Sequence, residues 1–172
     1  RDSVFVLDTS ASMSGNKIKK KKNDSIKVIE QLLSDSNNRI ALISFETKST
    51  ILSDFTNDKD KLVSLIENIN VDGSTNYNAG LKSINKLMEN YKKEDDRELI
   101  VLFLTDGEPN EEIPNQKATY EILKTKYPYM TIAGIQYEMG VIAENEIKEI
   151  SDNHYLANVD NLENVLLQAA LN

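Results

Sequence analysis

Short apolar runs alternate with amphipathic stretches along the chain, and this alternation limits the possible fold more than any other feature of the sequence. Four runs are apolar at nearly every position, as expected of strands covered on both faces: residues 3–7 (SVFVL), 40–45 (IALISF), 99–104 (LIVLFL) and 130–136 (MTIAGIQ). Two shorter strands are predicted at residues 49–54 and 154–157. Apolar residues at helical spacing predict helices over residues 17–34, 58 or 60 to 69, 78–91, 116–126, 143–151 and 161–171.

This order of elements predicts an α/β domain with a mostly parallel, doubly wound sheet and helices on both of its faces. Only residues 46–48 separate the second strand from the third, so these two strands should form an antiparallel hairpin. The run 99–104 is the most apolar and is expected to be the central strand, beside the first. Ligands of such sheets bind beyond the carboxyl ends of the strands. Chemistry is therefore expected just after Leu7 and just after Leu104.

Length, charge and composition exclude several classes of function. With 172 residues the chain fits one domain, residues 1–172, and because it opens at Arg1 without a signal peptide we expect it to be excised from a longer parent protein. The net charge of −8 argues against binding to nucleic acid or to anionic lipid, and no apolar run is long enough for direct membrane insertion. The chain has no Cys and a single His, His154, which excludes thiolate sites and a zinc centre built from histidines.

One cluster of charge has the opposite sign to the whole chain. It consists of Lys17, Lys19, Lys20, Lys21 and Lys22, all within one predicted helix. We interpret these lysines as a solvated helix face rather than as a site for a polyanion.

Side-chain oxygens gather at the two places where the fold predicts chemistry. Asp8, Ser10 and Ser12 alternate directly after the first strand, and Asp106 follows the central strand. Thr75 lies in a loop just before a predicted helix. Two carboxylates and three hydroxyls are hard oxygen ligands, a set that suits a small cation such as Mg²⁺. Taken singly, each of these residues would also serve as a helix cap or a turn residue.

The motif D-x-S-x-S-M-x-G after the first strand, together with Thr75 and with Thr105-Asp106-Gly107 after the central strand, resembles the von Willebrand factor type A (VWA) domain family. Over essentially the whole chain, this resemblance implies a six-stranded sheet of order 3-2-1-4-5-6 with helices on both faces and one antiparallel edge strand. It also implies an intact metal-ion-dependent adhesion site (MIDAS) that binds Mg²⁺, with Mn²⁺ or Ca²⁺ as alternatives. The metal ligands, direct or through water, would be Asp8, Ser10, Ser12, Thr75 and Asp106.

The resemblance further implies a protein partner that supplies a carboxylate to the metal. An enzyme is disfavoured by the residues, since a phosphohydrolase of the haloacid dehalogenase type would need a second Asp where this chain has Ser10. The chain also lacks a phosphate-binding loop and a G-x-S-x-G elbow. We therefore expect a non-catalytic, monomeric binding domain. Two settings stay open: an extracellular or cell-surface adhesion module, slightly favoured, and an intracellular assembly domain of the chelatase or ATPase-cofactor type.

Overall fold

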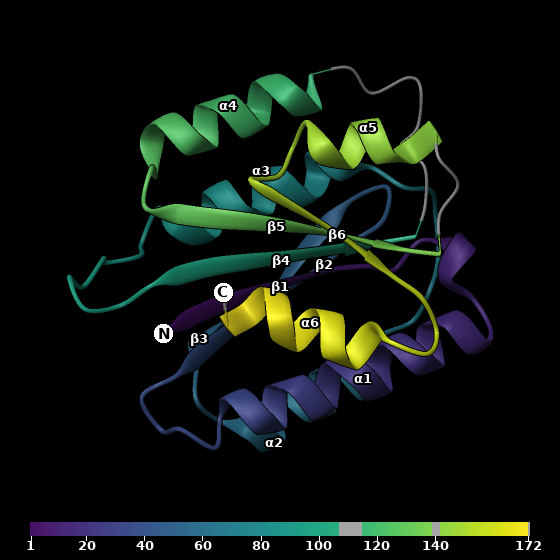
Figure 1. Ribbon diagram of the computed structural model, residues 1–172, viewed down its shortest axis with the longest axis horizontal. Coiled ribbons are helices and arrows are strands. Elements are labelled where there is room, and N and C mark those ends of the chain that lie inside the picture. Colours follow the sequence, from purple (N-terminus) through teal and green to yellow (C-terminus); the bar gives the residue numbers. More distant parts are fainter. Residues whose placement is uncertain (107–114, 139–141, 172) are drawn as a thin grey trace.

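The computed structural model describes residues 1–106, 115–138 and 142–171 (Figure 1). Its strands are β1 (Asp2–Asp8), β2 (Arg39–Phe45), β3 (Ser49–Thr56), β4 (Leu99–Thr105), β5 (Met130–Tyr137) and β6 (Asn153–Ala157). Its helices are α1 (Asn16–Leu32), α2 (Lys59–Glu67), α3 (Tyr77–Met88), α4 (Gln116–Lys126), α5 (Ile142–Lys148) and α6 (Leu162–Leu171), with a short 3₁₀ turn, η1 (Ala11–Met13), after β1. None of the helices in these described ranges is long and apolar enough to cross a membrane.

The six strands form one sheet of order β3-β2-β1-β4-β5-β6. All neighbouring strands are parallel except β2 and β3, which form the predicted antiparallel hairpin. The strand β4 pairs with β1 in the middle of the sheet, with Val4 opposite Val101. The predicted fold class, including the strand order and the single antiparallel edge strand, is confirmed.

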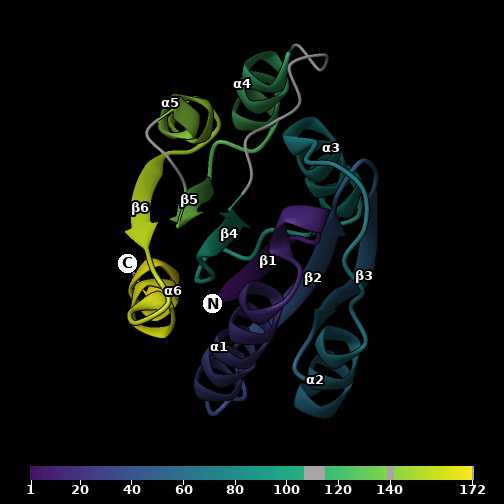
Figure 2. The same ribbon diagram turned by 90° about the vertical axis from the view of Figure 1, so that its right-hand side faces the viewer.

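Helices cover both faces of the sheet, as Figures 1 and 2 show. Side chains alternate along β1: Val4 and Val6 pack in the core beneath α3, α4 and α5, whereas Phe5 and Leu7 pack on the side of α1, α2 and α6. All four side chains are buried. Because a central strand is covered on both faces, β4 is apolar at every position but its last, and β1 is apolar throughout its middle, residues 4–7.

The structure differs from the predicted elements mainly at helix ends. The helix α1 ends at Leu32 rather than at residue 34, and α3 ends at Met88 rather than at residue 91. Asp58 caps α2, since its side chain accepts a hydrogen bond from the backbone N–H of Lys61. The short turn η1 was not predicted. A loop is expected from Asp106 to Pro114; Asp106 is described, whereas residues 107–114, including Gly107 of the Thr105-Asp106-Gly107 motif, lie outside the described residues.

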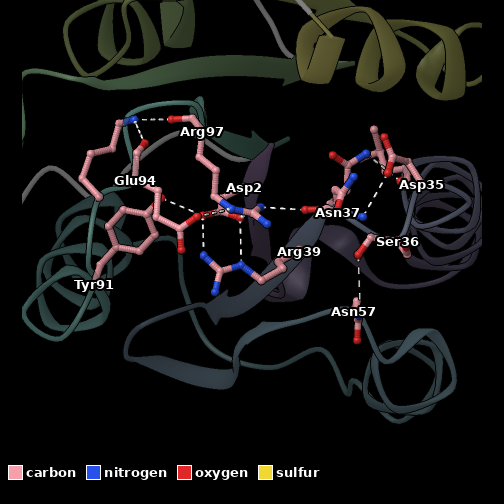
Figure 3. A network of polar contacts seen from close by, with 12 residues as sticks. Asp2, Asp35, Ser36, Asn37, Arg39, Asn57, Tyr91, Glu94 and Arg97 are labelled. Carbon is pink, nitrogen blue, oxygen red and sulfur yellow. Dashed lines mark hydrogen bonds and ion pairs between the residues drawn. The ribbon is translucent and has the colours of Figure 1, made fainter.

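A buried carboxylate joins several segments at the amino end of the sheet (Figure 3). Asp2 is fully buried and accepts hydrogen bonds from Arg39 Nε (3.0 Å) and Nη2 (2.8 Å), from Arg97 Nη1 (2.8 Å) and from the hydroxyl of Tyr91 (2.7 Å). Burial alone would raise the pKa of Asp2, but the hydrogen bonds from Arg39 and Tyr91 and the two guanidinium charges hold that pKa below its ordinary value. This cluster, the Asp2 network, lies at the opposite end of β1 from the predicted site.

Candidate metal site at the carboxyl ends of the strands

The site begins where the two central strands end side by side. The last residue of β1 is Asp8 and the last residue of β4 is Thr105, so Asp8 and Asp106 reach the same edge of the sheet, which faces the viewer in Figure 2. The hydroxyl of Thr105 donates to Oδ2 of Asp8 at 2.6 Å, and the backbone N–H of Ser10 donates to Oδ1 at 2.9 Å. Both carboxylate oxygens of Asp8 are thus held in place by donors from two different strand ends.

A continuous chain of hydroxyl groups runs from Thr75 to Asp106. Thr75 Oγ1 donates to Ser10 Oγ at 3.0 Å, Ser10 and Ser12 share a hydrogen bond of 2.9 Å between their Oγ atoms, and Ser12 Oγ donates to Asp106 Oδ1 at 2.9 Å. Because the one hydroxyl hydrogen of Ser12 points to Asp106, Ser10 is the donor to Ser12. Each hydroxyl therefore keeps lone-pair capacity for a cation.

Backbone contacts bring the Thr75 loop to the loop after β1. The N–H of Asp72 donates to the carbonyl of Thr9, and the N–H of Ala11 donates to the carbonyl of Gly73, each at 3.0 Å. Gly73 has a φ of 70°, and a Cβ there would collide with the carboxylate of Glu46. A glycine is needed at this position because the backbone is left-handed and the neighbouring side chain is close.

Simple capping does not explain two of the predicted site residues. The cap of α3 is Asn76, whose side chain accepts from the N–H of Ala79, so Thr75 is free of that role. The residue before α1 is Gly15, and no side chain caps that helix. Asp8 instead accepts the N–H of Ser10, two residues on, in an Asx-type turn.

All five predicted site residues lie in this cluster, and most are covered. The exposed fractions are 0% for Asp8, 1% for Ser10, 5% for Thr75 and 8% for Asp106, whereas Ser12 is exposed. The cluster therefore opens to solvent at Ser12. That the five residues bind a metal stays a prediction.

Lys17, Lys21 and Lys22 of α1 make contacts with other segments that the sequence did not indicate. Lys17 Nζ lies 3.0 Å from Asp106 Oδ2. Lys21 is buried and donates to the backbone carbonyl of Asp8, and Lys22 donates to carbonyls at the end of α2. The interpretation of the cluster as a solvated helix face fits Lys19, which is exposed, but is wrong for Lys21, because tertiary structure supplies a buried acceptor for its ammonium group.

Burial lowers the pKa of Lys21 to about 8, although the negative charges of Asp8 and Asp106 oppose that shift. Thr105, whose hydroxyl holds the Asp8 carboxylate, is also part of the site and was not predicted as a site residue. A lysine pair at i and i+4, on the helix that follows the D-x-S-x-S loop, is the signal that would have placed Lys17 and Lys21 on one side of α1.

The donor set fits a small divalent cation. Mg²⁺ takes oxygens at about 2.0–2.1 Å in an octahedron, in which adjacent oxygens lie about 2.9 Å apart. The linked oxygens of Thr75, Ser10, Ser12 and Asp106 are spaced at 3.0, 2.9 and 2.9 Å. Within residues 1–106, 115–138 and 142–171, no three His, Asp or Glu side chains form a group that could hold a metal ion. An ion at this edge would therefore depend on the hydroxyls as well as on the two carboxylates.

Comparisons with known proteins agree with this fold and place the cluster inside the matched region. The family model of the von Willebrand factor type A domain matches residues 3–108, a range that contains all five predicted ligands. Inter-alpha-trypsin inhibitor heavy chain H1 of Sus scrofa is 30% identical over 128 residues, a match that covers 70% of this chain and 14% of that protein. The chain thus spans about one seventh of the length of this relative.

Two solved structures have the same fold at low sequence identity. The vWF domain of the type V pili tip protein Mfa5 from Porphyromonas gingivalis superposes with a TM-score of 0.86 at 16% identity, covering 99% of this chain and 93% of that one. Proximal thread matrix protein 1 from the mussel byssus, in a structure with a zinc-occupied MIDAS motif, has a TM-score of 0.78 at 18% identity and covers 98% of this chain and 44% of that one.

Proposed function

Since this chain belongs to the von Willebrand factor type A domain family, we propose that it binds one divalent cation through Asp8, Ser10, Ser12, Thr75 and Asp106 and uses it to bind a carboxylate of a protein partner. Mg²⁺ is the proposed ion, with Mn²⁺ or Ca²⁺ as alternatives. The chain of hydroxyl and carboxylate oxygens from Thr75 to Asp106, spaced at 2.9–3.0 Å, is the observation that carries the proposal.

The residues around the ligands favour this role. Thr105 and the N–H of Ser10 fix the orientation of the Asp8 carboxylate, as partners of metal ligands do in protein metal sites. The hydroxyl hydrogens point along the chain toward Asp106, which leaves lone pairs for coordination. A cation bound here supplies an electrophilic position, because two carboxylates and neutral hydroxyls leave it short of negative charge and of ligands. Ser12 is exposed, so a partner can approach from solvent.

The relatives support both the metal and the class of function. A structure of mussel proximal thread matrix protein 1 has a zinc-occupied MIDAS motif, and the likeness in fold supports the proposal that this chain also binds a metal. The similar proteins include inter-alpha-trypsin inhibitor heavy chains and a pilus tip protein, and on this basis we propose an extracellular or cell-surface adhesion module rather than an intracellular assembly domain. We propose a domain that is monomeric by itself and has no catalytic activity.

Calorimetry on chelator-treated protein tests the metal. We expect one site for MgCl₂ and for MnCl₂, and loss of binding in Asp8→Ala. Because Asp8 is buried and Asp8→Ala can impair folding, Ser12→Ala is the second variant, and Ser14→Ala is its matched control on the same exposed turn. Ser12→Ala should weaken binding about 10-fold or more, whereas Ser14→Ala should bind as the parent does. Equal binding by all of these proteins would refute the proposed ligands.

The partner's role is tested by binding that is measured with Mg²⁺ and with EDTA. A partner isolated from the native source should be retained only with the divalent ion, and it should lose binding to a folded Thr75→Ala variant. Replacement of the partner's contacting Asp or Glu by Asn or Gln should have the same effect. Retention under EDTA would show that the binding face lies elsewhere.

A further inference from the structure

We propose that Lys17 is a tethered cation that competes with a bound divalent ion for Asp106 and so weakens the ion's affinity. The inference rests on the proposed function, since it concerns the same site, but it assigns a regulatory role to a residue outside the ligand set. The loop after β1, which carries ligands, and the first turn of α1, which carries Lys17, would together set the concentration of divalent ion at which the site is occupied.

The geometry places Lys17 against a ligand oxygen. Lys17 Nζ lies 3.0 Å from Oδ2 of Asp106, while Oδ1 of the same carboxylate accepts the hydroxyl of Ser12 at 2.9 Å. The side chain of Asp106 has 0% exposure and that of Lys17 has 39%. Lys17 can therefore move into water, whereas Asp106 cannot, and both Asp106 oxygens are already engaged by protein donors.

The charges at the site require one of the lysines to withdraw. Asp8 and Asp106 bring two negative charges, and Lys17 and Lys21 bring two ammonium groups. A divalent ion added beside all four would leave two positive charges in excess within a few ångströms, which is costly away from bulk water. Lys21 is buried and held by the carbonyl of Asp8, so Lys17 is the group that can leave.

The neighbouring lysines provide the matched control. Lys20 pairs with Asp24, and Lys22 contacts the end of α2, but Lys19 is exposed on the same helical turn as Lys17. Lys17→Met and Lys19→Met change the net charge of the domain equally. A difference between these two variants therefore reports the position of the Lys17 ammonium group and not a general change of charge.

Calorimetric titration of chelator-treated protein with MgCl₂ and with MnCl₂ tests the competition. We expect Lys17→Met to bind each ion at least about fivefold more tightly than the parent, because a partly exposed ion pair no longer has to be broken. Lys17→Gln is a second neutral variant and should behave in the same way. Lys19→Met should bind as the parent does, and Lys17→Arg, which keeps the charge, should bind no more tightly than the parent.

Thermal unfolding gives a second measurement that does not depend on the binding isotherm. In EDTA, Lys17→Met should unfold at a lower temperature than the parent, because the buried Asp106 carboxylate loses its counter-charge. Addition of MgCl₂ should then raise the unfolding temperature more in Lys17→Met than in the parent.

The outcomes separate this inference from the proposed function. If the parent binds Mg²⁺ and Lys17→Met binds it with the same affinity, or if Lys19→Met tightens binding equally, the inference is overturned and the metal site remains. If neither ion binds to the parent or to either neutral Lys17 variant, the metal site is refuted together with the inference. Binding that appears only in the neutral Lys17 variants would support both.

Discussion

Thr105 donates a 2.6 Å hydrogen bond to Oδ2 of Asp8 and so ties the carboxyl end of β4 to the carboxyl end of β1. Both residues are fully buried. The bond places one carboxylate of the proposed metal site under the control of a neighbouring strand, because Asp8 cannot turn without breaking it.

Replacement of Thr105 by Val tests this bond. Valine keeps the shape of the side chain and removes the hydroxyl, so a buried oxygen of Asp8 loses its donor and Tyr77 loses its hydrogen bond with Thr105, at a cost of about 1–3 kcal/mol in the free energy of unfolding. Urea unfolding in EDTA measures the loss, and Thr105→Ser, which keeps the hydroxyl, is the control. A Thr105→Val protein as stable as the parent would mean that the Thr105 hydroxyl contributes nothing to the stability of the fold.

The Asp2 network should contribute a large share of stability at the other end of β1. Asp2→Asn leaves the guanidinium groups of Arg39 and Arg97 without a buried negative partner, and we expect the free energy of unfolding to fall by about 3 kcal/mol. Asp96→Asn is the matched control, because Asp96 is exposed. Equal urea midpoints for the two variants would show that the Asp2 network does not contribute this share of stability.

The same carboxylate predicts how stability depends on pH in acid. The pKa of Asp2 in the folded protein lies below its ordinary value of 3.8, so the unfolded chain takes up this proton first as the pH falls. The contribution of Asp2 is therefore complete above about pH 5 and is lost as the pH falls through its folded pKa. Measured by urea unfolding, the free energy of unfolding should fall less between pH 6 and pH 3 for Asp2→Asn than for the parent. An equal loss would place the acid sensitivity in other groups.

Gly134 of β5 is required by the close approach of α5. A Cβ at Gly134 would lie 2.6 Å from Cγ2 of Ile147 and 2.9 Å from Cβ of Ser151, so Gly134→Ala should cost about 1–3 kcal/mol through overpacking. Gly80→Ala is the comparison. A Cβ there would meet the ring of Phe103 at 3.1 Å, and alanine favours the helix α3, so we expect a smaller loss in thermal unfolding.

The fold could be predicted because its signals are local. The two central strands contain unbroken apolar runs, at residues 4–7 and 99–104, and the three residues between β2 and β3 leave room only for a hairpin. Asp8 and Asp106 could be placed together because each follows a central strand. The ends of α1 and α3 were less accurate, since charged and polar residues continue past both helices and no Pro or Gly marks their ends.

The partners of buried charges could not be predicted, because they come from distant parts of the chain. The residues that donate hydrogen bonds to the Asp2 carboxylate lie at positions 39, 91 and 97, and no spacing rule links them to residue 2. Lys21 looks like any other residue of a lysine run, and its burial depends on the carbonyl of Asp8, which accepts its hydrogen bond, and on the negative charges of Asp8 and Asp106. Asn76 and Thr75 are both good caps by residue type, and the backbone geometry decides between them.

Asp2 and Asp8 stand at opposite ends of one buried strand, about 20 Å apart at roughly 3.3 Å for each residue. Changes at sites so far apart are generally additive in their effect on stability. Sequence drift in the loops after β1 and β4 can therefore alter the proposed binding edge while the Asp2 network preserves the sheet. For the same reason, the domain is a suitable scaffold for grafting loops of new specificity onto the carboxyl edge.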